Sequence, residues 1–123
     1  MNTTRHHAER WTVELPRIGP VCRLGLATRG NTTLEAGDVE RAVDRGVNYL
    51  NWCGHPDGLQ QWVRDCGTRR HEVRVAVQLS ARSAAAAERG LEELLEQRGT
   101  DYLDVVTYYY VEHIEEWRRI VGS

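Results

Sequence analysis

The stretch Ala42-Val43-Asp44-Arg45-Gly46-Val47-Asn48-Tyr49-Leu50-Asn51-Trp52 decides the fold, because its pattern changes from helix to strand within a few residues. Its first part continues a helical face that begins near Thr32 and Glu35, a pair with capping-box spacing, and Gly46 ends the helix. Val47 to Trp52 is a short apolar run typical of a buried strand. A helix that leads directly into such a strand is typical of a parallel α/β sheet.

The alternation of strands and helices continues on both sides of this stretch. Upstream, Val13 to Pro20 predicts a turn or short hairpin, and Val21 to Ala27 predicts a strand covered on both faces. Downstream, apolar periodicity predicts helices over 59–66, 87–95 and 114–121 and strands over 73–78 and 102–110. The fold class is therefore α/β, built from parallel βαβ units. A doubly wound sheet and about half of a (β/α)8 TIM barrel, strands one to four with their helices, both fit this pattern.

Composition restricts the classes of function. The chain has 123 residues and a net charge of -2, so it has no excess of basic charge for binding nucleic acid. No apolar run is long enough to cross a bilayer, and residues 1–12 form a polar head without a signal-peptide core, followed by one domain over 13–123. The chain has three cysteines, an odd number, and their spacing forms no disulfide pattern: Cys22, Cys53 and Cys66. This favours free thiols in a reducing compartment. We expect a cytoplasmic protein with no nucleic-acid or membrane partner.

Three motifs point to a known family. Arg23-Leu24-Gly25-Leu26-Ala27-Thr28 is similar to the first-strand signature of the aldo-keto reductases. Ala42 to Asn51 is similar to the family segment that ends at a catalytic aspartate, and Leu91 to Asp104 resembles the segment that leads into strand four. The motifs occur in family order. A complete (β/α)8 barrel needs roughly 250 residues, so the resemblance implies the N-terminal half of the barrel only, an NADP-dependent oxidoreductase-like domain.

The resemblance also marks four positions at which the family carries its Asp, Tyr, Lys and His tetrad. Here they are occupied by Asn51, His55, Gln78 and Tyr109. Carbonyl reduction requires a hydride donor and a tuned acid, and neither neutral amide carries a charge that could lower the pKa of a tyrosine. The resemblance therefore implies a truncated or degenerate aldo-keto reductase-like protein without carbonyl reductase activity as this chain alone. It implies NADPH as the cofactor but supplies few of the residues that would hold it, and it implies no metal.

An alternative interpretation retains the oxidoreductase activity. Half a barrel leaves its first and last strands unpaired and exposes an apolar wall, so a partner is physically implied. If a homodimer or a second chain completes the barrel, the protein would be an NADPH-dependent oxidoreductase acting on aldehydes or ketones. His55 or Tyr109 would then be the substitute proton donor. If the resemblance misleads, a small parallel α/β binding domain remains, without a glycine-rich phosphate loop.

Other residue clusters have a chemical and a structural interpretation. Asn51, Gln78 and Tyr109 could line a polar pocket at the top of the strands, or could simply hydrogen-bond one another. Cys53, His55 and Asp57 share one turn, a spacing that seldom aims a nucleophile and its base at one atom, and a metal site from Cys53, His55 and either Cys66 or His71 has no second ligand pair. Tyr108 to Tyr110 could stack on a flat ligand, although packing is the simpler role. Trp62 and Trp117 lie on apolar stripes that predict core positions.

Overall fold

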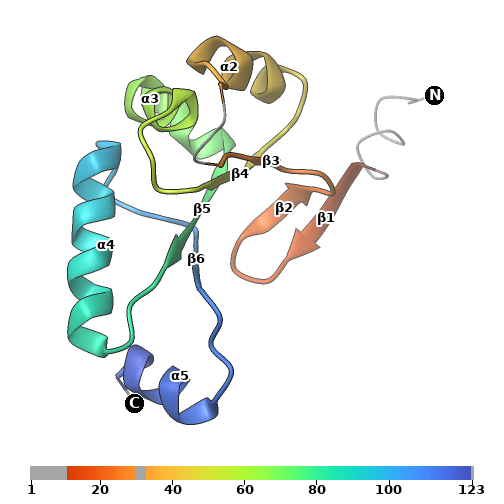
Figure 1. Ribbon diagram of the computed structural model, residues 1–123. Coiled ribbons are helices and arrows are strands. Elements are labelled where there is room, and N and C mark those ends of the chain that lie inside the picture. Colours follow the sequence, from red (N-terminus) through yellow and green to blue (C-terminus); the bar gives the residue numbers. More distant parts are fainter. Residues whose placement is uncertain (1–10, 30–32, 123) are drawn as a thin grey trace.

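A computed structural model describes residues 11–29 and 33–122 of the chain (Figure 1). The elements follow in the order β1 (Thr12–Leu15), β2 (Gly19–Cys22), β3 (Leu26–Ala27), α2 (Ala36–Asp44), β4 (Tyr49–Trp52), α3 (Gly58–Asp65), the 3-10 helix η1 (Gly67–Glu72), β5 (Arg74–Leu79), α4 (Ala84–Arg98), β6 (Val105–Tyr108) and α5 (Ile114–Val121). Strands and helices thus alternate from β3 onward, as the sequence predicts. Within the described ranges, no helix is both long and apolar enough to cross a membrane.

The main sheet has four parallel strands in the consecutive order β3-β4-β5-β6. Leu50 pairs with Leu26 on one side and with Val75 on the other, which places apolar side chains of neighbouring strands in one row. The prediction of a parallel α/β sheet is confirmed. Because the strand order never reverses, β3 and β6 form the two edges of this sheet.

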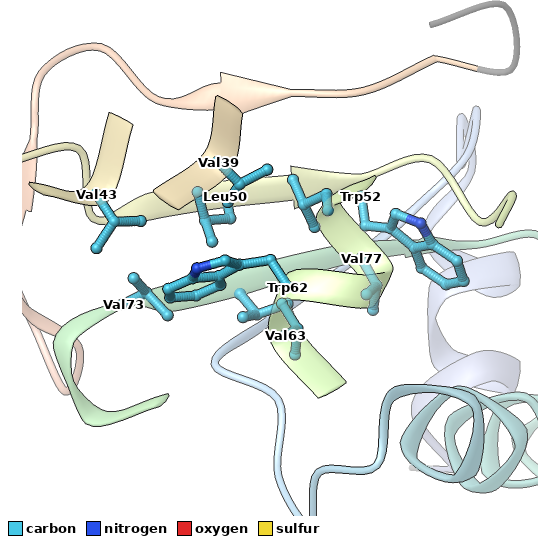
Figure 2. Close-up of a cluster of buried hydrophobic side chains, with 10 residues drawn as sticks. Val39, Val43, Leu50, Trp52, Trp62, Val63, Val73 and Val77 are labelled. Atoms are coloured by element: carbon cyan, nitrogen blue, oxygen red, sulfur yellow. The ribbon is translucent and has the colours of Figure 1, made fainter. Parts of the chain in front are cut away.

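Helices α2, α3 and α4 pack on one face of the sheet, and α5 lies next to α4 (Figure 1). Figure 2 shows Val39 and Val43 of α2 and Trp62 and Val63 of α3 gathered over the strands, where they meet Leu50, Trp52, Val73 and Val77. Leu94 of α4 and Val106 of β6 pack against the same cluster. Burying this much aliphatic and aromatic surface is the main source of stability, at about 1.5–3 kcal/mol per fully buried side chain.

The antiparallel pair β1–β2 confirms the predicted hairpin. It lies beside the N-terminal ends of the parallel strands, where the Arg74 Nε donates a hydrogen bond to the Ile18 carbonyl at 2.7 Å. Trp11 and Thr12, which the sequence assigns to a head, belong to this part of the fold, since Thr12 begins β1 and the Trp11 indole donates to the Gly46 carbonyl. Residues 1–10, including His6 and His7, lie outside the described residues.

Three expectations for elements are wrong. The run from Val21 to Ala27 is not one strand, because β2 leaves for the hairpin and only Leu26–Ala27 joins the parallel sheet. The expected strand over 102–110 is reduced to Val105–Tyr108. Helix α2 has its N-cap at Glu35, whose N–H donates to Asp38 at 2.9 Å, three residues later than expected; Thr32 lies outside the described residues. Pairing with neighbouring strands and local capping, not apolar periodicity, set these limits.

Two predicted core tryptophans behave differently. Trp62 is buried as expected, whereas Trp117 is 42% exposed. On α5 only Ile120 is buried, and Ile114, Trp117 and Val121 are exposed. Ile120 is covered and Trp117 meets the Tyr108 ring edge-on, but much of the apolar stripe of α5 is exposed, so the prediction that Trp117 is a core residue is wrong.

Candidate functional site

The sheet has one face that the helices do not cover. Leu50, Trp52 and Val77 point to the helical layer, so the residues that alternate with them along each strand point to the opposite side. We call this the helix-free face, and its members toward the C-terminal ends of the strands are Ala27, Asn51, Ala76, Gln78, Val105 and Thr107. The C-terminal ends of parallel strands are where barrel enzymes place their chemistry.

Two of the four tetrad positions lie on this face. Asn51 on β4 pairs with Ala76 on β5, and Gln78 is two residues further along the same strand. They are therefore diagonal neighbours with the same orientation, Asn51 half-buried and Gln78 exposed. Thr107, which pairs with Gln78, also belongs to the group and donates its hydroxyl to the Val77 carbonyl at 3.2 Å. Thr107 lies two residues before Tyr109, so the alternation of side chains along a strand could have identified Thr107 from the sequence.

Tyr109 lies immediately beyond β6. Its N–H donates to the Leu79 carbonyl at 3.1 Å, and its own carbonyl accepts a hydrogen bond from Arg82. The ring stacks on Tyr110 with centroids 6.1 Å apart, and 36% of Tyr109 is exposed. The Tyr109 backbone is therefore fixed while part of the side chain is accessible.

The prediction that Asn51, Gln78 and Tyr109 simply hydrogen-bond one another is wrong. Among the hydrogen bonds of the described residues, none joins the side chains of Asn51, Gln78 and Tyr109 to one another. The amide groups of Asn51 and Gln78 have no other side-chain hydrogen bond in the part of the chain that the structure describes. Half-exposed amides of this kind remain able to bind a ligand or another chain.

The expected apolar wall is also wrong. The helix-free face carries small and polar side chains at its C-terminal end, with Ala27, Gln78 and Thr107 exposed. Small and polar side chains lower the cost of contact with water, and they also fit the interior of a closed eight-stranded barrel, where space is limited.

His55 lies in the loop between β4 and α3, whose polar groups serve structural roles. The Asp57 Oδ1 accepts the Gln60 N–H at 2.9 Å and so caps α3, while Cys53 Sγ lies 3.8 Å from Asp57 Oδ2. The Trp52 indole donates to the His55 carbonyl at 2.8 Å. Cys53 and Asp57 are thus brought together, but no contact within the described residues joins the His55 imidazole to the Cys53 thiol.

The Cys53 loop has no metal-binding arrangement in the described ranges. No group of three or more His, Cys, Asp or Glu side chains there is close enough to share a metal ion. Cys53 and Cys66 lie at opposite ends of α3, one before Gly58 and one at the C-cap. Burial raises the pKa of the Cys66 thiol, which disfavours the thiolate that binds metals and attacks electrophiles.

A second polar site lies at the opposite end of the strands. Arg70 is buried and forms a salt bridge with Asp104 at 2.9 Å, and the same carboxylate oxygen accepts the Val75 N–H at 2.8 Å. The Arg70 guanidinium also donates to the Val73 and Tyr102 carbonyls and lies 3.9 Å from the centroid of the Tyr102 ring. These contacts use most of the N–H donors of the Arg70 guanidinium. Asp104 ends one of the three family-like motifs, and its role here is to join β5, η1 and the entry to β6.

Beside Arg70 lies an open cleft of about 610 Å³. It is formed where the C-terminal ends of α3 and α4 approach each other, and it includes Arg64, His71 and Asp101. Arg64 donates to the Gln97 carbonyl at 2.9 Å, so its charge offsets the partial negative charge of the last turn of α4. Arg64 therefore balances a helix end and Arg70 is paired with Asp104, so these two cations do not by themselves define an anion site.

No family model matches this chain, and no curated protein matches it. What the helix-free face does must therefore be argued from its own chemistry.

Proposed function

We propose that this chain is a half-barrel protein related to the aldo-keto reductases that does not reduce carbonyl compounds as a single chain. The topology supports a half-barrel over a doubly wound sheet. A doubly wound sheet reverses its strand order and carries helices on both faces, whereas here the order β3-β4-β5-β6 is consecutive and α2, α3 and α4 share one face.

The proposal about function rests on the side chains that occupy the helix-free face. Asn51 and Gln78 occupy neighbouring strands with the same orientation, and both are neutral amides. An amide pair can orient a ligand through hydrogen bonds but cannot activate one by charge. The proposed role of this face is therefore binding, not reduction.

NADPH oxidation tests the proposal directly. Purified chain is mixed with NADPH and a panel of aldehydes and ketones, and nicotinamide absorbance is followed with and without protein. We expect no protein-dependent oxidation. Turnover that disappears in Tyr109→Phe, with unchanged circular dichroism, would overturn the proposal, because it would show that an acid on this face supports the reaction.

A second candidate function is supported by the open outer edges of strands β3 and β6. If another chain completes the sheet, it could supply the cofactor site, and the protein would be an NADPH-dependent oxidoreductase with His55 or Tyr109 as proton donor. The exposed part of the Tyr109 ring at the C-terminal end of the strands favours this candidate. Its test is turnover by an isolated assembly at a rate that falls in His55→Ala or Tyr109→Phe.

A further inference from the structure

The two edges of the sheet are complementary. β6 is open on one side of the sheet and β3 on the other, and all four strands run in the same direction. A parallel strand that extends the sheet beyond β6 must therefore present the edge that β3 leaves open. This chain carries such an edge itself, so a second copy can supply it.

Backbone groups at both edges are available for pairing. In β6 the Tyr109 N–H donates inward to Leu79 at 3.1 Å, so by alternation Val106 and Tyr108 direct their N–H groups outward. In β3 the Thr28 N–H donates inward to Asn51 at 3.0 Å, so Ala27 directs its N–H outward. Within the described residues these outward groups pair with no other strand. Unpaired groups of this kind form a template for another strand.

Exposed apolar side chains lie beside the same two edges. On the β6 side, Tyr110 is 84% exposed, and Ile114, Trp117 and Val121 follow at the spacing of one helical face on α5. On the β3 side, Leu24 is 68% exposed immediately before the strand. Helix α5 packs against α4, with Gly122 beside Ala84 and Trp117 edge-on to Tyr108, so its exposed stripe lies at the C-terminal end of β6.

We propose that two copies of this chain associate about a twofold axis, with β6 of each copy pairing in parallel with β3 of the other. The pairing closes a sheet of eight strands, the number at which side chains just fill the interior of a parallel barrel. The small and polar helix-free faces become that interior. A net charge of -2 per chain opposes association only weakly. The inference rests on the proposed half-barrel and identifies a second copy of the chain as the partner that completes it.

The test uses one proline at each edge. Val106→Pro and Ala27→Pro each remove one outward N–H group and leave the hydrogen bonds between strands of the same chain in place; proline is tolerated at such edge positions. Each variant alone spoils both contacts of a twofold pair, because every contact contains one β6 and one β3. In a mixture of the two variants, a heterodimer places both prolines in one contact and leaves the other intact.

Sedimentation velocity gives the readout. We expect the wild-type chain to sediment as two copies of the 14.1 kDa chain, each proline variant as one, and the mixture to regain a dimer. Val106→Ala and Ala27→Ser keep the backbone N–H, are the matched controls and should stay dimeric, and circular dichroism verifies that all four variants are folded.

Three outcomes would overturn the pairing. The first is a monomeric wild-type chain. The second is dimers that only Val106→Pro disrupts, which would show β6 pairing with β6. The third is open polymers, which would show that the contact does not close. None of these bears on NADPH turnover, so the pairing and the proposed function fail separately: an active dimer would support the pairing and the second candidate function, whereas turnover by the monomeric Val106→Pro variant would overturn the first.

Discussion

At the scale of the residue, Arg70 and Asp104 show how one ion pair can hold several elements. Only 8% of the Arg70 side chain and 16% of the Asp104 side chain are exposed, and the carboxylate bonds both the guanidinium and the Val75 N–H. Loss of one partner leaves the other charge poorly solvated, which costs more than the pair itself contributes.

Arg70→Met should lower the free energy of unfolding by about 3 kcal/mol, because it strands the Asp104 carboxylate in a site that excludes most water. Urea denaturation monitored by tryptophan fluorescence measures the change. Arg89→Met removes an exposed arginine from α4 and should change the unfolding free energy by less than about 0.5 kcal/mol. Equal effects of the two substitutions would contradict a special role for Arg70.

Asp38 gives a prediction about pH. The Glu35 N–H that Asp38 accepts, with the charge of Arg41, lowers the pKa of Asp38 from its usual value. A lowered folded-state pKa contributes stability that is present above the unfolded-state pKa and is lost as the pH falls through the folded-state pKa. Asp38→Ala should therefore lower the melting temperature at neutral pH, and the difference from wild type should shrink below about pH 4. A difference that stays constant to low pH would contradict this assignment.

At the scale of the element, α2 and α3 meet where a glycine permits close approach. A Cβ added at Gly58 would lie 2.3 Å from the Glu35 carbonyl carbon and 2.5 Å from the Leu34 carbonyl oxygen. Both are backbone atoms, so the two segments would have to move apart. The Gly58 N–H also donates to the Leu34 carbonyl at 3.1 Å, which ties the start of α3 to the approach to α2.

Gly58→Ala should destabilise the protein by about 1–3 kcal/mol, since overpacking against backbone forces main-chain shifts. Gly37→Ala is the matched control in the first turn of α2, where the added methyl would meet only the Arg41 guanidinium at 3.9 Å. There alanine should stabilise by about 0.5–1 kcal/mol through a smaller loss of backbone entropy. Thermal unfolding of the two variants compares them, and opposite signs are expected.

At the scale of the whole molecule, the sheet ends at two open edges, and the most exposed apolar side chains gather beside them. Leu24 precedes β3, while Tyr110, Ile114 and Val121 follow β6. If the edges pair between copies, folding and association are linked, because a partner that binds only the folded chain stabilises it by mass action.

The melting temperature of the wild-type chain should therefore rise with protein concentration. In Val106→Pro, whose outward β6 edge lacks one donor, the melting temperature should be lower and independent of concentration. Differential scanning calorimetry over a wide concentration range measures both. A wild-type melting temperature that does not change with concentration would show that the folded unit is the single chain.

The sequence by itself determined the class of fold and most elements. Apolar residues recur every two or about every 3.6 positions because each element buries one face or both, so periodicity predicts the parallel sheet and the helices, while turn residues predict the hairpin. It also identified Asn51 and Gln78 as same-facing neighbours, since alternation along adjacent strands is local information. It misjudged Trp117, because an apolar stripe reveals only that a face needs cover, not whether the cover is present.

Only the tertiary structure decided which surfaces are covered. The split of Val21 to Ala27 between hairpin and sheet depends on which strand lies alongside, and the burial of Arg70 depends on its meeting Asp104 from a distant segment. The exposure of α5 and of both sheet edges likewise depends on where other elements lie. These are contacts between residues far apart in the chain, and local propensity carries no information about which distant groups will meet.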